Sequence, residues 1–100
     1  MKKILITGAT SGFGKATAER FAAAGHELII TGRREERLKQ LQQALREKFG
    51  VNVHVLCFDV QDRTAVFNAL SGNPLLAGLD VLVNNAGLAL GRDLFDVALS

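Results

Sequence analysis

The chain of 100 residues contains no tyrosine and no tryptophan, and it has one cysteine, Cys57. A lone cysteine excludes a disulfide framework and the paired-cysteine spacing of metal sites, so we predict no metal site and expect Cys57 in the core. No apolar run approaches the ~20 residues of a membrane-spanning helix. The apolar run after Lys2 and Lys3 is too short for a signal peptide. These absences predict a cytoplasmic protein with no membrane partner.

An excess of charge of one sign is also missing. Lys and Arg together number 12 and Asp and Glu 10, which gives a formal net charge of +2. The basic residues are not clustered beyond Arg33 and Arg34, so nothing indicates a nucleic-acid partner. Hydrophobic residues make up 48% of the chain, which is ordinary for a globular protein with a real core. We therefore expect one domain over residues 1–100.

Apolar patterning alternates between short β-rich runs and longer helical segments. The expected strands are Lys3–Thr7, Glu27–Thr31, Val51–Phe58 and Asp80–Gly87, and the expected helices are Gly14–Gly25, Glu35–Gly50 and Asp62–Leu70. A loop is expected at 71–78. This order, β-α-β-α-β-α-β, predicts an α/β fold in which helices pack on the faces of a parallel sheet.

Two of these segments carry further detail. The second expected helix places Leu38, Leu41 and Leu45 on one apolar stripe, which indicates the face that packs on the sheet. In the third expected strand Asn52 and His54 share one face, and this pattern suits a strand near an edge of the sheet.

A glycine-rich turn, "TGATSGFGK", joins the first expected strand to the first expected helix. In a doubly wound sheet this is where phosphates bind, because the helix N-terminus offers unpaired N–H groups and partial positive charge. We expect Gly8 to make the sharp turn and Gly12 to let a pyrophosphate approach the backbone. Gly14 is expected to let the helix pack against the strand. The alternative is a plain strand–helix turn without a ligand.

Side chains within the same turn add polar and aromatic groups. The hydroxyls of Thr10 and Ser11 can bond phosphate oxygens, whereas Phe13 either covers a cofactor or only packs against the protein. The whole turn is therefore assigned to cofactor binding, with the residues Gly8, Ala9, Thr10, Ser11, Gly12, Phe13 and Gly14.

The end of the second expected strand distinguishes between two dinucleotides. An acidic residue about 20 residues after the glycine turn holds the ribose hydroxyls of NAD. Here neither Thr31 nor Gly32 is acidic, and Arg33 and Arg34 follow. Guanidinium groups at this place suit the extra 2′-phosphate of NADP, through bidentate charge-assisted hydrogen bonds. The alternative is a pair of solvated loop charges.

Four motifs in this order, "TGATSGFG", "GRR", "FDV" and "LVNNAG", resemble the N-terminal half of a short-chain dehydrogenase/reductase. The resemblance covers essentially the whole chain. The stretches "GFGKATAERF", "TGRREERL" and "LVNNAGLALG" look closest to the bacterial NADP-dependent 3-hydroxy acid, or serine-type, dehydrogenases of that family. The resemblance implies a Rossmann-type three-layer sandwich with the strand order 3-2-1-4 and NADP as the cofactor.

The same resemblance implies further binding residues. Asp59 would bond the adenine amino group and Val60 would lie against the adenine ring, although Asp59 could instead be a loop or cap residue. Asn85, Ala86 and Gly87 would line the ribose on the nicotinamide side, although "NNAG" could instead be a polar turn that closes a strand.

The chain departs from the family at the catalytic motif. Longer members carry a Ser and a Tyr-x-x-x-Lys, whose Tyr exchanges the proton during hydride transfer. Because these 100 residues have no Tyr, we assign no catalytic residue and expect no catalysis from them alone. The chain could be part of a longer enzyme, a designed or deliberate fragment, or a natural truncated protein. If it ends at Ser100, "VLVNN" becomes an exposed apolar edge, which favours a homo-oligomer.

The sequence thus supports two functions of different classes. The first is the cofactor-binding part of an NADP-dependent oxidoreductase that transfers hydride between nicotinamide and a small alcohol or 3-hydroxy acid. The second is a nucleotide-binding module or half-Rossmann fragment without chemistry. An epimerase or regulator of the extended family is disfavoured, since its Gly-x-x-Gly-x-x-Gly turn and ribose acid are absent.

Overall fold

The computed structural model describes residues 1–85, which form a four-stranded parallel sheet. The strands are β1 (Lys3–Thr7), β2 (Glu27–Gly32), β3 (Val53–Cys57) and β4 (Val81–Asn84). Their order across the sheet is β3-β2-β1-β4, and every neighbouring pair runs parallel. The strand order that the family resemblance implied is therefore confirmed. The order changes direction at β1, so the turn after β1 lies at the point where α/β folds bind ligands.

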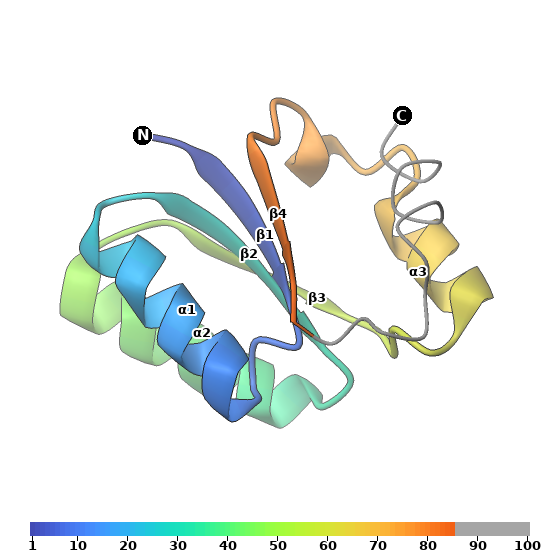
Figure 1. Ribbon diagram of the computed structural model, residues 1–100, viewed down its shortest axis with the longest axis horizontal. Coiled ribbons are helices and arrows are strands. Elements are labelled where there is room, and N and C mark those ends of the chain that lie inside the picture. The colour runs from blue at the N-terminus through green and yellow to red at the C-terminus, as the bar shows by residue number, and fades with distance from the viewer. Residues whose placement is uncertain (86–100) are drawn as a thin grey trace.

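Helices cover both faces of this sheet (Figure 1). The helices α1 (Gly12–Ala23) and α2 (Glu35–Phe49) pack on one face, where Ala18 and Ala22 join the same apolar cluster as the leucines of α2. The helix α3 (Arg63–Leu70) packs on the other face through Val66 and Leu70, and the 3₁₀ turn η1 (Pro74–Leu76) follows it. The three-layer α/β sandwich is confirmed.

The strands β1 and β2 form the centre of the core. Ile4 and Ile6 of β1 face α1 and α2, and Leu5 between them faces α3, and all three are fully buried. Burial on both faces explains why β1 reads as a continuous apolar run instead of an alternating one. The apolar stripe predicted on α2 is also confirmed, since Leu38, Leu41 and Leu45 are its buried residues.

The helix α1 begins two residues earlier than the sequence predicted. Ser11 is its N-cap, and the Ser11 hydroxyl accepts a hydrogen bond from the N–H of Gly14. A serine that caps a helix offsets the low helix propensity of the glycines that follow it. Pattern alone places the start at Gly14, whereas the cap moves it to Gly12.

The expectation that Cys57 lies in the core is wrong, because its side chain is exposed. Cys57 is the last residue of β3, and β3 is the outer neighbour of β2 at one edge of the sheet. An edge strand loses its cover at its ends, which a pattern of apolar residues does not reveal. The position of β3 agrees with the edge strand predicted from Asn52 and His54.

The described residues 1–85 contain neither a helix that could span a membrane nor a cluster that could bind a metal ion. No helix there is long and apolar enough to cross a membrane. No group of three or more His, Cys, Asp or Glu side chains in these residues could hold a metal ion.

Candidate functional site

The glycine turn after β1 is fixed by hydrogen bonds of its own backbone. Gly8 has a φ of 62°, which a residue with a side chain rarely adopts. Its carbonyl oxygen accepts from the N–H of Ser11 at 3.1 Å and from the Ser11 hydroxyl at 2.8 Å. Gly8 therefore makes the sharp turn, as predicted, and Ser11 closes it.

Gly14 and Gly12 differ in whether the fold itself requires a glycine. A Cβ on Gly14 would lie 1.9 Å from the carbonyl oxygen of Gly8, so only glycine lets α1 pack this closely on the turn. A Cβ on Gly12 would meet nothing within 4 Å, and the φ of Gly12 is not positive. Nothing in the described chain requires a glycine at position 12. Its open side is the space that the predicted pyrophosphate needs.

The N-terminus of α1 faces the same space with unused donors. The N–H groups of Gly12 and Phe13 occupy the first two helical positions, where no carbonyl of the same helix can reach them. The first turn of α1 contains no acidic residue that could compete with an incoming anion. This end of the helix therefore favours negative charge.

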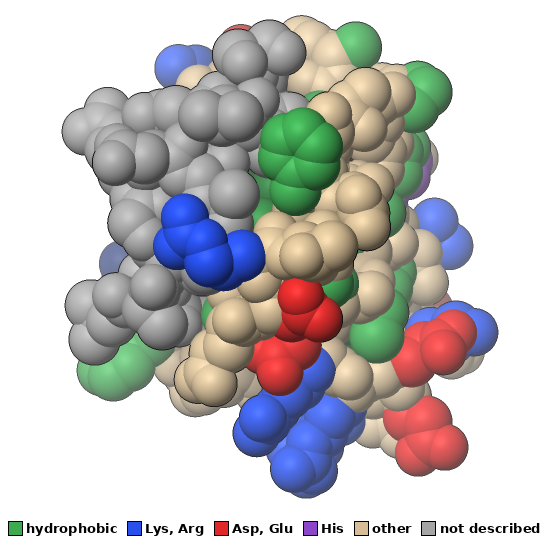
Figure 2. All heavy atoms as spheres, turned by 90° about the vertical axis from the view of Figure 1, so that its right-hand side faces the viewer, with side chains coloured by type: hydrophobic (Ala, Val, Ile, Leu, Met, Phe, Trp, Pro, Cys, Tyr) green, Lys and Arg blue, Asp and Glu red, His purple; other side chains and the backbone are tan. Residues whose placement is uncertain are grey.

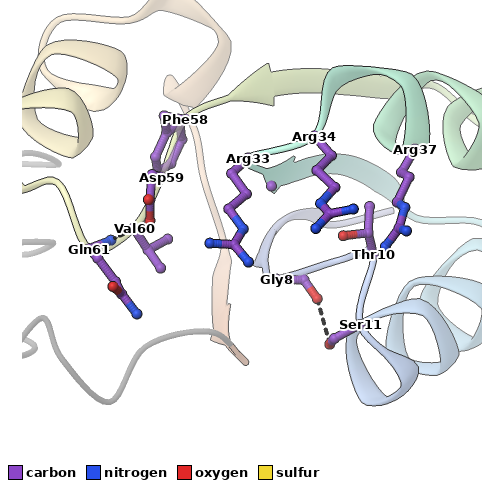
Figure 3. Close-up of a pocket in the computed structure, with 11 residues that line it drawn as sticks. Gly8, Thr10, Ser11, Arg33, Arg34, Arg37, Phe58, Asp59, Val60 and Gln61 are labelled. Carbon is purple, nitrogen blue, oxygen red and sulfur yellow. Dashed lines mark hydrogen bonds between the residues drawn. The ribbon is translucent and has the colours of Figure 1, made fainter.

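The glycine turn forms one wall of a cavity of about 350 Å³ at the carboxyl ends of β1, β2 and β3 (Figure 3). The described residues that line the cavity come from the segments after these three strands. They are Gly8, Thr10, Ser11, Gly32, Arg33, Arg34, Arg37, Phe58, Asp59, Val60 and Gln61.

Three of the lining side chains are arginines that have no partner among the described residues. Arg33, Arg34 and Arg37 extend side by side above the glycine turn, and Arg34 and Arg37 lie close to Thr10 (Figure 3). None of these guanidinium groups makes a hydrogen bond or ion pair with residues 1–85. The nearby acid Glu35 is bound to Lys39 instead, at 3.0 Å. The cavity therefore holds an excess of positive charge.

Basic side chains also stand out at this end of the molecule in the space-filling view. They gather at the lower end of Figure 2, which is the end where the β1–α1 turn lies in Figure 1. A small acidic group lies directly above them. Positive and negative side chains thus occupy neighbouring parts of one surface.

The opposite wall of the cavity follows β3 and is held by an aspartate. One carboxylate oxygen of Asp59 accepts from the N–H of Gln61 at 2.9 Å, and the Asp59 carbonyl accepts from the N–H of Asp62 at 3.0 Å. These bonds hold the turn after β3. Asp59 therefore has, in part, the loop role that was predicted as the alternative to adenine binding. Phe58 is buried beneath this wall, and Val60 is partly exposed and faces the cavity.

Some predicted binding residues do not line the cavity. Ala9 is fully buried and its N–H donates to the carbonyl of Thr31 at 3.0 Å, so it joins the turn to β2. Phe13 is 87% exposed and Asn85 is exposed just beyond β4. Gly12 and Gly14 lie in the helix next to the cavity. The predictions for Ala86 and Gly87 lie outside the described residues.

Ser11 has a structural role that the sequence did not indicate. Its hydroxyl already donates to Gly8 and accepts from Gly14, at 2.8 and 3.2 Å. The phosphate contact predicted for Ser11 stays a prediction and requires this hydroxyl to leave its bonds. The hydroxyl of Thr10, by contrast, has no such bond within residues 1–85.

The fold brings to the site several residues that were not predicted from the sequence. Arg37, Phe58 and Gln61 line the cavity, and the Thr7 hydroxyl donates to the side-chain oxygen of Asn84 at 2.7 Å. That bond joins the carboxyl ends of β1 and β4 beside the glycine turn. Arg37 had a detectable signal, because it follows Arg34 by one helical turn.

The comparisons with known proteins agree with this geometry. The family model described as short chain dehydrogenase matches residues 2–98. The chain belongs to the short-chain dehydrogenase family. The serine 3-dehydrogenase of Rhizobium radiobacter is 54% identical to this chain over 89 residues, which is 88% of this chain and 34% of the relative. The NADP-dependent 3-hydroxy acid dehydrogenase of Escherichia coli K12 is 45% identical over 91 residues, or 90% and 35% of the two chains.

Solved structures of short-chain dehydrogenases share the fold. One from Sphingobium yanoikuyae, in complex with NADPH, matches with a TM-score of 0.75 and 41% identity, over 87% of this chain and 34% of that one. The serine dehydrogenase of Escherichia coli matches with a TM-score of 0.70 and 45% identity, over 88% and 39%. The chain thus spans about a third of the length of the curated relatives it matches.

Proposed function

We propose that this short-chain dehydrogenase binds NADP(H) at the cavity after β1, β2 and β3, and that it forms the cofactor-binding part of an oxidoreductase. The observation that carries the proposal is the pairing of the glycine turn, in one cavity, with three arginines that have no partner in residues 1–85. Relatives named as NADP-dependent and a neighbour described with NADPH support it. We extend the proposal to residues 1–100 as one part of the family's dinucleotide-binding domain.

The glycine turn and α1 would bind the pyrophosphate. Gly12 leaves open space beside the backbone, and the free N–H groups at the start of α1 donate to phosphate oxygens. Thr10 adds a hydroxyl at the cavity wall. These residues fit a dinucleotide because the chain itself leaves both the space and the donors unused.

The segment after β2 would select the phosphorylated cofactor. Arg33 and Arg34 line the cavity where a ribose acid would stand in an NAD-dependent protein, and they have no partner in residues 1–85. A guanidinium binds a phosphate through paired, charge-assisted hydrogen bonds. We therefore assign the 2′-phosphate to Arg33 and Arg34.

The segment after β3 would bind the adenine. Val60 presents an apolar surface to the cavity, and one oxygen of the Asp59 carboxylate has no partner among the described residues. That oxygen can accept from an amino group. We assign the nicotinamide-side ribose to Asn85, which follows β4, and to Ala86 and Gly87, which are next in the sequence.

We propose a small alcohol or 3-hydroxy acid as substrate, on the basis of relatives named for serine and 3-hydroxy acids. NADP carries the hydride on its nicotinamide ring when it is bound. The chain's own residues orient that cofactor, and the sequence has no Tyr that could exchange the proton. The second candidate, a nucleotide-binding module without chemistry, would use the same cavity.

The proposal is tested by titrating NADPH and NADH against the protein in its native length. We expect NADPH to bind more tightly, and we expect Arg33→Ala to weaken NADPH binding about tenfold to hundredfold while NADH binding changes little, since a hydrogen bond to a charged group contributes about 1.5–3 kcal/mol. Arg63→Ala in α3 is the matched control, because Arg63 does not line the cavity. Equal affinity of the wild-type protein for both cofactors contradicts the NADP assignment.

A further inference from the structure

We propose that Arg37 is a third specificity-determining residue, which binds the 2′-phosphate together with Arg34 and Thr10. This inference rests on the NADP function proposed above and extends it to a residue of α2. The segment 33–34 that the sequence singled out would then form only part of the phosphate site.

The position of Arg37 brings it into the cavity from a helix. Arg34 is the N-cap of α2, and Arg37 lies three residues later, so the two side chains project from the same face of the first turn. Figure 3 shows both extending toward Thr10. A helix holds a side chain more firmly in place than the loop that carries Arg33.

A second cavity shows that Arg37 lies on the side of α2 that borders α1. It has a volume of about 450 Å³ and lies between α1 and α2, lined by Thr10, Lys15, Arg37, Gln40, Leu41 and Ala44. We call it the helix groove. Thr10 and Arg37 line both the helix groove and the cofactor cavity. They therefore form the boundary between the two cavities, and Lys15 lies only on the far side.

The charge of Arg37 is unfavourable without a ligand. Arg37 lies in the first turn of α2, where the helix dipole disfavours a cation, and Arg34 adds a like charge one turn away. The acid that could relieve it, Glu35, is bound to Lys39 at 3.0 Å. No other carboxylate of residues 1–85 is within ion-pair distance of Arg37.

A phosphate dianion between Arg34 and Arg37 would remove this conflict. It would be attracted by both guanidinium groups and by the N-terminus of α2, and it could accept from the free hydroxyl of Thr10. The same arrangement offers a neutral 2′-hydroxyl no comparable attraction, because the hydroxyl carries no charge for the two guanidinium groups to bind. Arg37 would thus raise the discrimination between the two cofactors more than the affinity for their shared parts.

The test measures the affinities of 2′-phospho-ADP-ribose and ADP-ribose by calorimetric titration, with the protein in its native length. We expect the wild-type protein to prefer the phosphorylated probe, and Arg37→Gln to lower that preference about tenfold. Arg37→Lys should retain part of it, because the charge stays but the paired donors are lost. Since Arg37 is exposed and has no partner among residues 1–85, Arg37→Lys should unfold at the wild-type temperature, and Arg37→Gln should unfold at that temperature or slightly above it, because it removes an unfavourable charge.

Lys15→Gln is the matched control, because it removes an equal charge that lines only the helix groove. It should leave the preference within about twofold, because Lys15 does not line the cofactor cavity and exposed charges are screened by salt. A preference that survives Arg37→Gln overturns the inference and leaves the NADP proposal standing. A loss in Lys15→Gln equal to that in Arg37→Gln also overturns it, because the effect is then a general field. A wild-type protein that binds both probes equally refutes the NADP proposal itself.

Discussion

The two ends of the sheet differ in whether their charged side chains are bonded within the protein. At the amino ends of the strands, Lys3 donates through Nζ to the carbonyls of Leu75 and Ala77, each at 2.9 Å, and its N–H donates to Asp80 at 2.8 Å. At the carboxyl ends, Arg33 and Arg34 have no partner in residues 1–85. The polar groups of Lys3 at the amino ends are thus bound by the chain itself, whereas the arginines at the carboxyl ends are available to a ligand.

Further contacts extend the contrast. Near the amino ends, Nε2 of His54 lies 2.7 Å from a carboxylate oxygen of Glu27, and Arg46 donates to the carbonyl of Val53 at 2.9 Å. At the carboxyl end even a buried hydroxyl, that of Thr31, lacks a partner among the described residues. Buried polar groups are normally satisfied, so the Thr31 hydroxyl is an exception among the described residues.

The largest effect is expected within the glycine turn itself. Gly14→Ala should destabilise the fold by about 3 kcal/mol or more, because its Cβ would meet the backbone oxygen of Gly8 at 1.9 Å. Denaturant unfolding measures the loss. Gly12→Ala is the control, since its Cβ meets nothing within 4 Å. It should unfold like the wild type and still bind NADPH at least about tenfold more weakly, which is about 1.4 kcal/mol. If Gly14→Ala and Gly12→Ala have the same free energy of unfolding, the steric difference between the two glycines is refuted.

A smaller effect is expected at the amino ends of the strands. Lys3→Met removes the donor to Leu75 and Ala77, and it should lower the free energy of unfolding by about 2 kcal/mol. Cofactor affinity should not change. Lys39→Met is the control, because its pair with Glu35 is exposed and contributes at most about 0.5 kcal/mol. Should Lys3→Met weaken NADPH binding as well, the two ends are not independent.

The smallest effect is a gain in stability. Thr31→Val replaces an unpartnered buried hydroxyl by a methyl group of nearly equal size, and it should raise the free energy of unfolding by about 1 kcal/mol. Thermal unfolding measures the shift. Thr64→Val on α3 serves as a control, since Thr64 is exposed and a change there should be within about 0.5 kcal/mol. A destabilised Thr31→Val would mean that the hydroxyl has a partner.

The sequence was sufficient for the elements that depend on local pattern. The four strands and three helices, the apolar stripe of α2 and the sharp turn at Gly8 follow from periodicity and from backbone freedom. The sequence was not sufficient where contacts with distant parts of the chain determine the exposure or the role of a residue. The exposure of Cys57 depends on the end of an edge strand, and the buried backbone role of Ala9 depends on Thr31 of β2.

The candidate site divides in the same way. Arg33, Arg34 and Asp59 were predicted, and the structure brings them to one cavity. Arg37 was missed because a single arginine on a helix is usually solvated. The phosphate contact of Ser11 stays a prediction, and the structure adds a role in the turn, because the Ser11 hydroxyl accepts from Gly14 and donates to Gly8.

The most direct test of the account is hydrogen–deuterium exchange with and without NADPH, on the protein in its native length. We expect slower exchange on binding in residues 8–15, 32–38 and 58–62, which surround the cavity. We expect no change in residues 24–27 and 71–80, which do not line the cavity. Protection confined to the amino ends of the strands, or no protection after β1 and β2, would contradict the account.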